Sequence, residues 1–228
     1  MNVGVIIVAA GRGTRMSAPR PKALIDVGGR AMVTWAADHL AAAGLPAPVV
    51  VHSPGERGAF ADALTGHEVH LVVGGSTRSD SVRRGLAALD ADIVVVHDAA
   101  RPFMPPEVIQ RALAAVGGDV IAAAPAVAVA DTLKRRAGDD LVGTVARDDL
   151  VAVQTPQVFI RAALDTALAA GASATDELTL VEGAIAAGEL TGRIRFVAGS
   201  VFGHKVTTED DFALLDTIAS ASLQGFGA

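Results

Sequence analysis

The 228-residue sequence contains no cysteine, no tyrosine and only one tryptophan. The absence of cysteine excludes a disulfide framework, a thiolate zinc site and a cysteine nucleophile. Aromatic residues make up 4% of the chain and leave few rings for stacking on nucleic-acid bases. A net charge of −6 also disfavours a broad nucleic-acid-binding face. We therefore expect no nucleic-acid partner.

Long hydrophobic runs are absent as well. No run approaches the about 18 apolar residues of a membrane span. The first apolar run has no basic segment ahead of it and leads directly into a glycine-rich loop, unlike a signal peptide. The hydrophobic fraction of 51% is nevertheless ample for one core. These features predict a cytoplasmic protein that does not bind membranes, folded as a single domain over residues 1–228.

Apolar, β-branched runs alternate with alanine-rich stretches along the chain. The expected strands are residues 3–10, 48–52, 69–73, 93–97, 120–124 and 151–153. The expected helices are residues 32–43, 79–89, 106–116, 160–170 and 177–187, with a last helix beginning near Thr208. This alternation predicts an α/β fold with a mainly parallel, Rossmann-like sheet and helices on both faces. Ligands of such sheets bind beyond the carboxyl ends of the strands.

A basic hairpin interrupts the alternation after Pro125. Residues 131–136 and 141–147 have the pattern of two strands around Ala137-Gly138-Asp139-Asp140. Its cations are Lys134, Arg135, Arg136 and Arg147. We expect an exposed β-arm at about residues 131–150, and either a solvated hairpin or a partner-binding arm fits this pattern.

The most informative stretch is the loop after the first expected strand, Gly11-Arg12-Gly13-Thr14-Arg15-Met16. Two glycines let its backbone turn tightly and present N–H groups to phosphate oxygens. Arg12, Arg15 and Lys22 add cationic donors at the same edge, which favours a polyphosphate ligand. The loop lacks the Gly-Lys-Ser/Thr of a Walker A loop, and Met16 replaces the third glycine of a dinucleotide fingerprint. On the loop alone, an ordinary strand-ending turn is an open alternative.

A second motif, His97-Asp98-Ala99-Ala100-Arg101-Pro102, ends another strand. An acidic residue at the end of a buried strand is costly unless it is paired or binds a metal. Asp98 facing a triphosphate would be a natural Mg²⁺ ligand, and Arg101 could grip a phosphate. The alternative is an Asp98–Arg101 ion pair that fixes the loop, and we interpret His97 as structural.

Three further stretches carry weaker signals. Gly74 to Ser81 opens a helix with glycines and hydroxyls, which suits either a nucleotide contact or a helix cap. Thr175-Asp176-Glu177 has the same ambiguity, since Thr175 is a plausible N-cap. Lys205, in His204-Lys205-Val206-Thr207, is a phosphate-binding candidate if the fold returns it to the site.

Together these motifs resemble the 2-C-methyl-D-erythritol 4-phosphate cytidylyltransferases, nucleotidyltransferases with a glycosyltransferase-A-like fold. The resemblance runs from Ala9 to about Asp211, and the order and number of its motifs make it specific. The matching elements are Ala9-Ala10-Gly11-x-Gly13-x-Arg15-Met16, Pro21-Lys22, Gly75 to Ser81, His97 to Pro102, Asp131-Thr132-Leu133-Lys134, Gln154-Thr155-Pro156-Gln157, Thr175-Asp176-Glu177 and Lys205-Val206-Thr207.

The resemblance implies an enzyme of the non-mevalonate isoprenoid pathway that makes CDP-methylerythritol and pyrophosphate from CTP and a polyol phosphate, with Mg²⁺ or another divalent cation. The implied CTP contacts are Ala9, Ala10, Gly11, Gly13, Gly75, Ser81 and Ala99. Asp98 would hold the metal, and the implied catalytic cations are Arg15, Lys22 and Lys205. The implied polyol-phosphate contacts are Arg101, Thr132, Thr175, Lys205 and Arg147. The resemblance also implies a homodimer in which the arm carries Arg147 into the neighbouring site.

The sequence departs from the family pattern in two places. Gly203 stands where many members carry asparagine, and Ser76-Thr77 stand where an acidic pair is frequent. Neither departure removes a charged catalytic group. A ribitol 5-phosphate cytidylyltransferase and a catalytically silent nucleotide-binding paralogue are the open alternatives. Ala99-Ala100 after the aspartate favours the methylerythritol enzyme over the first.

Overall fold

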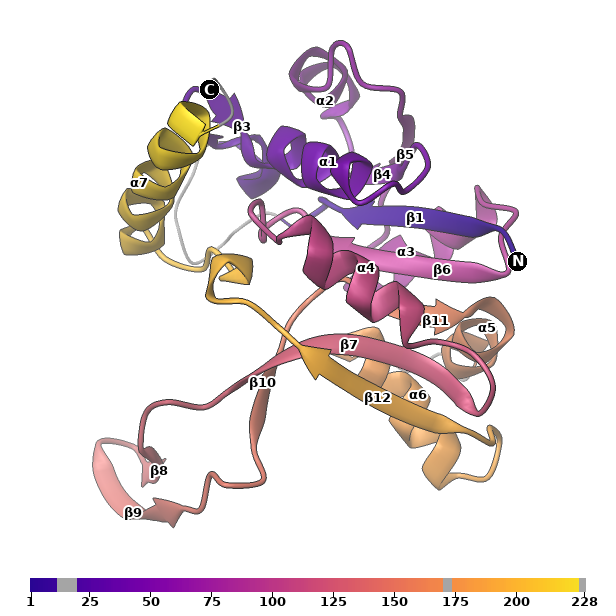
Figure 1. Ribbon diagram of the computed structural model, residues 1–228, viewed down its shortest axis with the longest axis vertical. Helices are drawn as coiled ribbons and strands as arrows, with labels where there is room; N and C mark the ends of the chain where they lie inside the picture. The colour runs from indigo at the N-terminus through magenta and orange to yellow at the C-terminus, as the bar shows by residue number, and fades with distance from the viewer. Residues whose placement is uncertain (12–19, 170–173, 226–228) are drawn as a thin grey trace.

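The computed structural model describes residues 1–11, 20–169 and 174–225. Its centre is an eight-stranded sheet with helices on both faces, which confirms the predicted α/β architecture (Figure 1). The strands of this sheet are β1 (Val3–Val8), β4 (Val49–His52), β5 (His70–Val73), β6 (Ile93–Asp98), β7 (Val120–Ala128), β10 (Val151–Val153), β11 (Gln157–Ile160) and β12 (Arg193–Ala198). Their order is β10-β7-β11-β6-β1-β4-β5, and β12 pairs with β7 outside this path.

The sheet combines a parallel half with a mixed half. Strands β5, β4, β1 and β6 are parallel neighbours. Strand β11 runs antiparallel to both β6 and β7, β10 runs antiparallel to β7, and β12 runs parallel to it. The sequence did not predict β11 or β12. The first is short and continues directly into a helix, and the second carries two arginines and is largely exposed.

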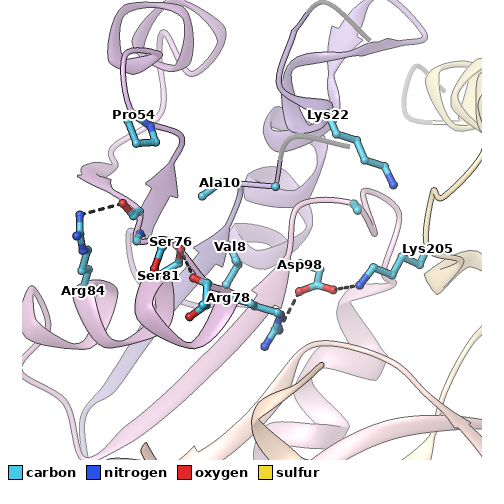
Figure 2. Close-up of a pocket in the computed structure, with 15 residues that line it drawn as sticks. Val8, Ala10, Lys22, Pro54, Ser76, Arg78, Ser81, Arg84, Asp98 and Lys205 are labelled. Atoms are coloured by element: carbon cyan, nitrogen blue, oxygen red, sulfur yellow. Dashed lines mark hydrogen bonds and ion pairs between the residues drawn. The ribbon is translucent and has the colours of Figure 1, made fainter. Parts of the chain in front are cut away.

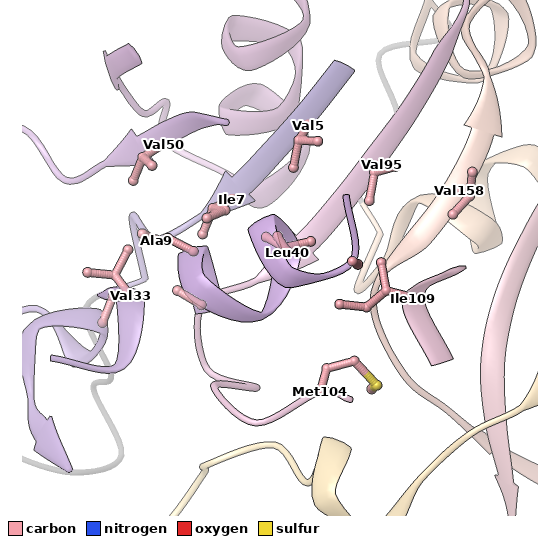
Figure 3. Close-up of a cluster of buried hydrophobic side chains, with 14 of the residues drawn as sticks. Val5, Ile7, Ala9, Val33, Leu40, Val50, Val95, Met104, Ile109 and Val158 are labelled. Atoms are coloured by element: carbon pink, nitrogen blue, oxygen red, sulfur yellow. The ribbon is translucent and has the colours of Figure 1, made fainter. Parts of the chain in front are cut away.

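Helices cover both faces of the sheet. The helix set on one face is α1 (Met32–Ala42), α2 (Arg57–Ala63) and α4 (Pro106–Ala114), and the set on the other is α3 (Arg78–Ala87), α5 (Arg161–Ala169) and α6 (Glu177–Ala186). Consecutive β1 side chains alternate between the two layers: Val5 and Ile7 pack with α1 (Figure 3), and Ile6 packs with α3. Burial on both faces explains why the central strands are uninterrupted apolar runs.

A smaller layer closes one end of the molecule. Helix α7 (Asp210–Gly225) packs against a short hairpin of β2 (Asp26–Val27) and β3 (Arg30–Ala31) (Figure 1). The capping box predicted at Thr208 is confirmed, because Thr208 N donates to Asp211 Oδ2 at 2.8 Å while Asp211 N donates to Thr208 Oγ1 at 3.4 Å. Within the described ranges, none of the helices has the length and apolar character needed to cross a bilayer.

The predicted hairpin is confirmed as β8 (Leu133–Ala137) and β9 (Asp140–Val145). It forms a separate two-stranded sheet that protrudes from the body between β7 and β10 (Figure 1). Leu141 and Val142 are 67% and 64% exposed at its tip. We call residues 131–150 the arm.

Candidate functional site

An open pocket of about 740 Å³ lies where β1, β5 and β6 end (Figure 2). Seven sequence-predicted site residues line it: Ala10, Gly11, Lys22, Gly75, Ser81, Asp98 and Lys205. They come from five separate parts of the chain, and the sheet brings them together because parallel strands present their carboxyl ends at one edge. The pocket therefore lies at the predicted edge of the sheet, and ligand binding there stays a prediction.

Asp98, at the end of β6, is the centre of an ion-pair network. Its Oδ1 accepts a hydrogen bond from Arg78 Nη2 at 2.9 Å, and its Oδ2 accepts one from Lys205 Nζ at 2.5 Å (Figure 2). The Arg78 guanidinium also pairs with Glu177, a fully buried carboxylate at the start of α6. The alternative of an Asp98–Arg101 ion pair is wrong. Among the residues that the structure describes, the ion-pair partners of Asp98 are Arg78 and Lys205.

The network sets the charge states of its members. Burial alone would raise the pKa of the Asp98 carboxyl, but the positive charges of Arg78 and Lys205 hold it well below its usual value. Burial would lower the pKa of Arg78, and the negative charges of Asp98 and Glu177 outweigh it and raise that pKa. Burial raises the pKa of Glu177 in spite of Arg78. Asp98 is therefore ionised at neutral pH and aimed into the pocket.

The Arg78–Glu177 pair was missed by sequence reasoning. Arg78 sits inside the Gly74–Ser81 motif and Glu177 inside the Thr175 motif, but nothing in either motif says that they meet. Their pairing depends on α3 and α6 covering the same face of the sheet.

The N-cap of α6 is Asp176, whose Oδ1 accepts from Thr179 N at 2.9 Å, so the prediction that Thr175 caps this helix is wrong. An aspartate at this position offers the stronger acceptor.

Lys205 is held in place through its neighbours. The Lys22 ammonium donates to the Val206 carbonyl oxygen, and Val206 N donates to Ala100 O at 2.9 Å. Lys22 and Lys205, 183 positions apart in sequence, thus face the same pocket. The Lys205 side chain is 42% exposed, which leaves its long stem free to turn within the pocket.

Arg101 supports the segment that carries Lys205. Its Nη1 donates to Gly203 O at 2.6 Å and its Nη2 donates to Val153 O at 3.2 Å. These contacts join the Lys205 segment to β10, from which the arm extends. In this structure the Arg101 guanidinium donates to these two backbone carbonyl oxygens. A contact between Arg101 and the polyol phosphate stays a prediction.

The Gln154–Gln157 motif supports Asp98 and the Lys205 segment. Thr155 Oγ1 accepts from Asp98 N at 3.0 Å and lies 3.2 Å from His97 Nδ1. Gln154 Nε2 donates to Ser200 O at 2.7 Å, close to the start of the Lys205 segment. Burial lowers the pKa of His97 to about 4, so this ring is neutral at pH 7 and its role is structural, as expected from sequence.

Gly203 is explained by close packing. A Cβ added there would lie 2.2 Å from Met104 Cε and 3.2 Å from the Gln154 amide. The asparagine that the family pattern leads one to expect would therefore require Met104 to move. Met104 is fully buried, so the space for that movement is small.

Replacing Gly203 by alanine is expected to destabilise the protein by about 1–3 kcal/mol, because an extra methyl group overpacks the site. Urea denaturation followed by circular dichroism measures the change. Gly183→Ala in α6 is the matched control: a Cβ there meets nothing within 4 Å, and helix propensity should stabilise that variant by about 0.5–1 kcal/mol. Equal stability of the two variants would contradict the packing argument.

The Gly74–Ser81 segment forms the wall beside β5. Thr77 is the N-cap of α3, accepting from Asp80 N at 3.0 Å, so the cap interpretation is confirmed. A Cβ at Gly74 would lie 2.6 Å from the Ala10 Cβ, so only glycine lets this wall approach the end of β1. Ser76 Oγ donates to Asp80 Oδ2 at 2.7 Å, which places a capping interaction where the family often has acidic residues.

The remaining predicted site residues fall into three groups. Ala9 and Ala99 are buried, and their amides donate to sheet carbonyls, Val51 O at 2.8 Å and Val8 O at 3.1 Å. Thr132, Arg147 and Thr175 are at least partly exposed, and the described lining of the pocket includes none of the three. Gly13 and Arg15 lie outside the described residues.

The donor set suits one type of divalent-metal site. Mg²⁺ is commonly bound through one or two carboxylates together with substrate phosphates and water. Asp98 supplies such a carboxylate, and within the described residues no group of three His, Cys, Asp or Glu side chains could enclose an ion by itself. A metal here would therefore need the phosphates of a bound nucleotide as further ligands.

Comparisons with known proteins agree on one family. A family model described as 2-C-methyl-D-erythritol 4-phosphate cytidylyltransferase (IspD) matches residues 3–221. The enzyme of that name from Nocardia farcinica is 42% identical over 221 residues, covering 95% of this chain and 94% of its own length. The bifunctional enzyme IspD/IspF of Clavibacter michiganensis is 45% identical over 224 residues, covering 92% of this chain and 52% of its own length, so this chain spans about half of that relative. The crystal structure of the Thermus thermophilus cytidylyltransferase superimposes with a TM-score of 0.81 at 33% identity, covering 96% of this chain and 100% of that one.

Proposed function

The chain belongs to the family of 2-C-methyl-D-erythritol 4-phosphate cytidylyltransferases, and from this membership we propose how its own residues perform the family's reaction. It joins CTP and 2-C-methyl-D-erythritol 4-phosphate to form CDP-methylerythritol and pyrophosphate, a step of the non-mevalonate isoprenoid pathway. The observation that carries the proposal is the pocket in which Lys22, Asp98 and Lys205 meet beside two glycine-rich segments. Because CTP is a cytoplasmic metabolite, we place the enzyme there.

The reaction needs charge stabilisation more than a strong base. An oxygen of the acceptor phosphate attacks the α-phosphorus of CTP, the bond from that phosphorus to the α,β-bridging oxygen breaks, and pyrophosphate leaves with the electron pair. The attacking oxygen is already anionic, so no proton has to be removed from it. The barrier lies in bringing two anions together, and positioned cations lower such a barrier.

The residues of the pocket divide this task. Lys22 and Lys205 provide ammonium groups on the side where Asp98 lies, and we assign them to the α-phosphate and the leaving pyrophosphate. Gly11 and Gly75 also line the pocket, and we assign their backbone to the nucleotide. Arg15, from the loop outside the described residues, is proposed to add a third cation.

We propose Asp98 as the protein ligand of Mg²⁺. When bound, the ion neutralises phosphate charge and orients the triphosphate. Asp98 contributes a carboxylate whose pKa is held low by Arg78 and Lys205, and Arg78 with Glu177 fixes the direction in which that carboxylate points. Lys205, which shares Asp98 in this structure, is proposed to turn its ammonium toward the nucleotide phosphates.

The acceptor is tested by measuring pyrophosphate release with CTP and two polyol phosphates. We expect turnover with 2-C-methyl-D-erythritol 4-phosphate and at least about 100-fold lower kcat/KM with ribitol 5-phosphate, as expected for a site built to hydrogen-bond one polyol. Comparable turnover with ribitol 5-phosphate would contradict the assignment of the acceptor.

We also propose that the enzyme is a homodimer assembled through the arm. The arm is basic and protrudes, and Leu141 and Val142 are exposed apolar side chains at its tip. Arg147, at its base, donates to the Ala130 carbonyl oxygen of its own chain, away from the described lining of its own pocket. In a dimer with exchanged arms, Arg147 would reach the polyol phosphate in the neighbouring site.

Arg147→Ala is expected to raise KM for the polyol phosphate by about 10- to 100-fold and to leave KM for CTP unchanged, because one charge-assisted contact is lost. Steady-state kinetics with each substrate varied in turn measure both constants. Arg135→Ala, which removes another exposed arm cation, is the matched control.

Mixing two variant proteins distinguishes an active site that takes a residue from the neighbouring subunit from an active site contained in one chain. A heterodimer of Arg147→Ala and Lys22→Ala chains has one site with both lesions and one with neither, if each site takes its arginine from the neighbour. Activity should then partly recover after subunit exchange. Once exchange has been verified by mass spectrometry, an absence of recovery would rule out the exchanged arm.

A further inference from the structure

Lys205 lies on a short segment that has little apolar packing of its own. Residues 199–205, which we call the Lys205 segment, follow the end of β12 and include the 3₁₀ helix η3 (Val201–Gly203). Val201 and Phe202 are 78% and 50% exposed, so their side chains contribute little buried apolar area to hold the segment. The position of the Lys205 backbone therefore depends on the polar contacts that this segment makes.

Gln154 holds the start of the Lys205 segment with both halves of its side-chain amide. Its Nε2 donates to Ser200 O at 2.7 Å, and its Oε1 accepts from Ser200 N at 3.1 Å. The pair of bonds resembles the exchange of N–H and C=O bonds between two antiparallel strands, with a side chain in place of one strand. Both backbone polar groups of Ser200 are satisfied in this way, and their orientation is fixed.

Two glycines of the segment make room for the Gln154 amide. A Cβ added at Gly199 would lie 2.4 Å from Gln154 Oε1, and a Cβ added at Gly203 would lie 3.2 Å from Oε1 and 3.2 Å from Nε2. The Gln154 side chain is buried. The chain thus carries glycine at two positions where a side chain would push this amide away from Ser200.

The other end of the bridge is the central sheet. Gln154 directly follows β10, and its backbone N donates to Pro125 O of β7 at 2.8 Å. Strand β7 pairs with β10 and β11 and also with β12, so the sheet holds it on both sides (Figure 1). Gln154 therefore ties the Lys205 segment to a strand in the interior of the sheet.

On the proposed function, on which this inference rests, Lys205 stabilises charge on the nucleotide phosphates. We infer that Gln154 is a positioning residue that holds Lys205 for this task. Gln154 is not part of the described lining of the pocket and acts through Ser200, which sets the place from which the Lys205 side chain extends toward Asp98. Placement matters because a displacement of about 1 Å at a catalytic group can cost about 100-fold in rate.

Gln154→Met is expected to lower kcat by about 10- to 100-fold and to change KM for CTP by less than about 3-fold. Methionine keeps the length of the side chain and removes both bonds to Ser200, so the loss falls on the placement of Lys205 in the transition state. Steady-state kinetics measure both constants. Gln110→Met is the matched control: it removes a glutamine bond to Ala43 O outside the described lining of the pocket and should change kcat by less than about 3-fold.

A double-mutant cycle with Lys205→Met tests whether Gln154 acts through Lys205. In the Lys205→Met background no ammonium is left to position, so adding Gln154→Met should lower kcat by less than about a further 2-fold. A residue that only stabilises the fold would give the same loss in both backgrounds. Equal losses in the two backgrounds would therefore overturn the inference.

The lysine content of the chain allows a readout that does not depend on turnover. The lysines are at positions 22, 134 and 205, so ¹³C-lysine labelling gives three Cε signals, which single Lys→Arg variants assign. Gln154→Met should shift the signal of Lys205, whose Nζ donates to Asp98 Oδ2 at 2.5 Å, and should leave the signal of Lys134 on the arm in place. An unchanged Lys205 signal would contradict the positioning role.

Gly199→Ala disturbs the same contact from the opposite side and keeps the test available should Gln154→Met not fold. Its Cβ would push against Gln154 Oε1, so we expect the same fall in kcat and the same shift of the Lys205 signal. A folded Gly199→Ala protein with neither change would overturn the inference. Absence of CTP turnover in the wild-type protein would overturn the proposed function, and the Lys205 signal would still decide whether Gln154 positions this lysine.

Discussion

Lys22→Ala is expected to lower kcat by about 100- to 1,000-fold, the effect of removing one positioned charge from a transition state. The Lys22 ammonium lines the pocket and also donates to the Val206 carbonyl oxygen, next to Lys205. The substitution therefore removes a charge from the site and loosens the segment that carries the second lysine. Pre-steady-state quench experiments measure the chemical step, and thermal denaturation measures the effect on folding.

The chain offers a natural control for this experiment. It contains only three lysines, at positions 22, 134 and 205. Lys134 is exposed on the arm and donates to Thr144 Oγ1 at 2.7 Å, so Lys134→Ala should change kcat by less than about 3-fold. Lys22→Met, which keeps the apolar stem, separates lost charge from lost packing. A folded Lys22→Met protein with nearly normal kcat would remove Lys22 from the mechanism.

Asp98→Asn is expected to reduce metal-dependent activity by at least about 100-fold, since an amide keeps the shape of the carboxylate without the charge that holds Mg²⁺. The variant should also be less stable, because Asp98 pairs with two cations while 7% exposed. The decrease in the free energy of unfolding should be smaller than the about 3–5 kcal/mol that is lost when a buried ion pair is fully broken. Arg78 keeps Glu177 as a partner, and Lys205 is 42% exposed.

Metal titration separates the two roles of Asp98. Activity is measured against Mg²⁺ concentration for the wild type and for Asp98→Asn, with stability followed in parallel by urea denaturation. A metal role shifts the Mg²⁺ dependence, and a purely structural role lowers stability alone. An unchanged Mg²⁺ midpoint together with a large loss of stability would make Asp98 an ion-pair partner only.

The central strands could be predicted from the sequence because their burial is simple. Residues 3–8 and 93–96 lie in strands covered on both faces and therefore form uninterrupted apolar runs in the sequence. The glycines that follow β1 and β5 mark where each strand must turn. Asp98 was identifiable for the same reason, since a carboxylate at the end of such a strand requires a partner.

The parts that could not be predicted depend on contacts between distant segments. Strand β12 pairs with β7 through backbone hydrogen bonds, which leave no periodic apolar pattern when most of the strand is exposed. Arg78 and Glu177 lie 99 positions apart, and their pairing follows only from the packing of α3 and α6 on one face.

The most direct test follows the α-phosphorus of CTP. Wild-type enzyme is incubated with Mg²⁺, 2-C-methyl-D-erythritol 4-phosphate and CTP labelled at the α-phosphorus, and the products are separated by ion-exchange chromatography. The account predicts that the label moves into CDP-methylerythritol while the pyrophosphate formed is unlabelled. Label that stays in CTP, or that appears in CMP without a polyol product, would contradict it.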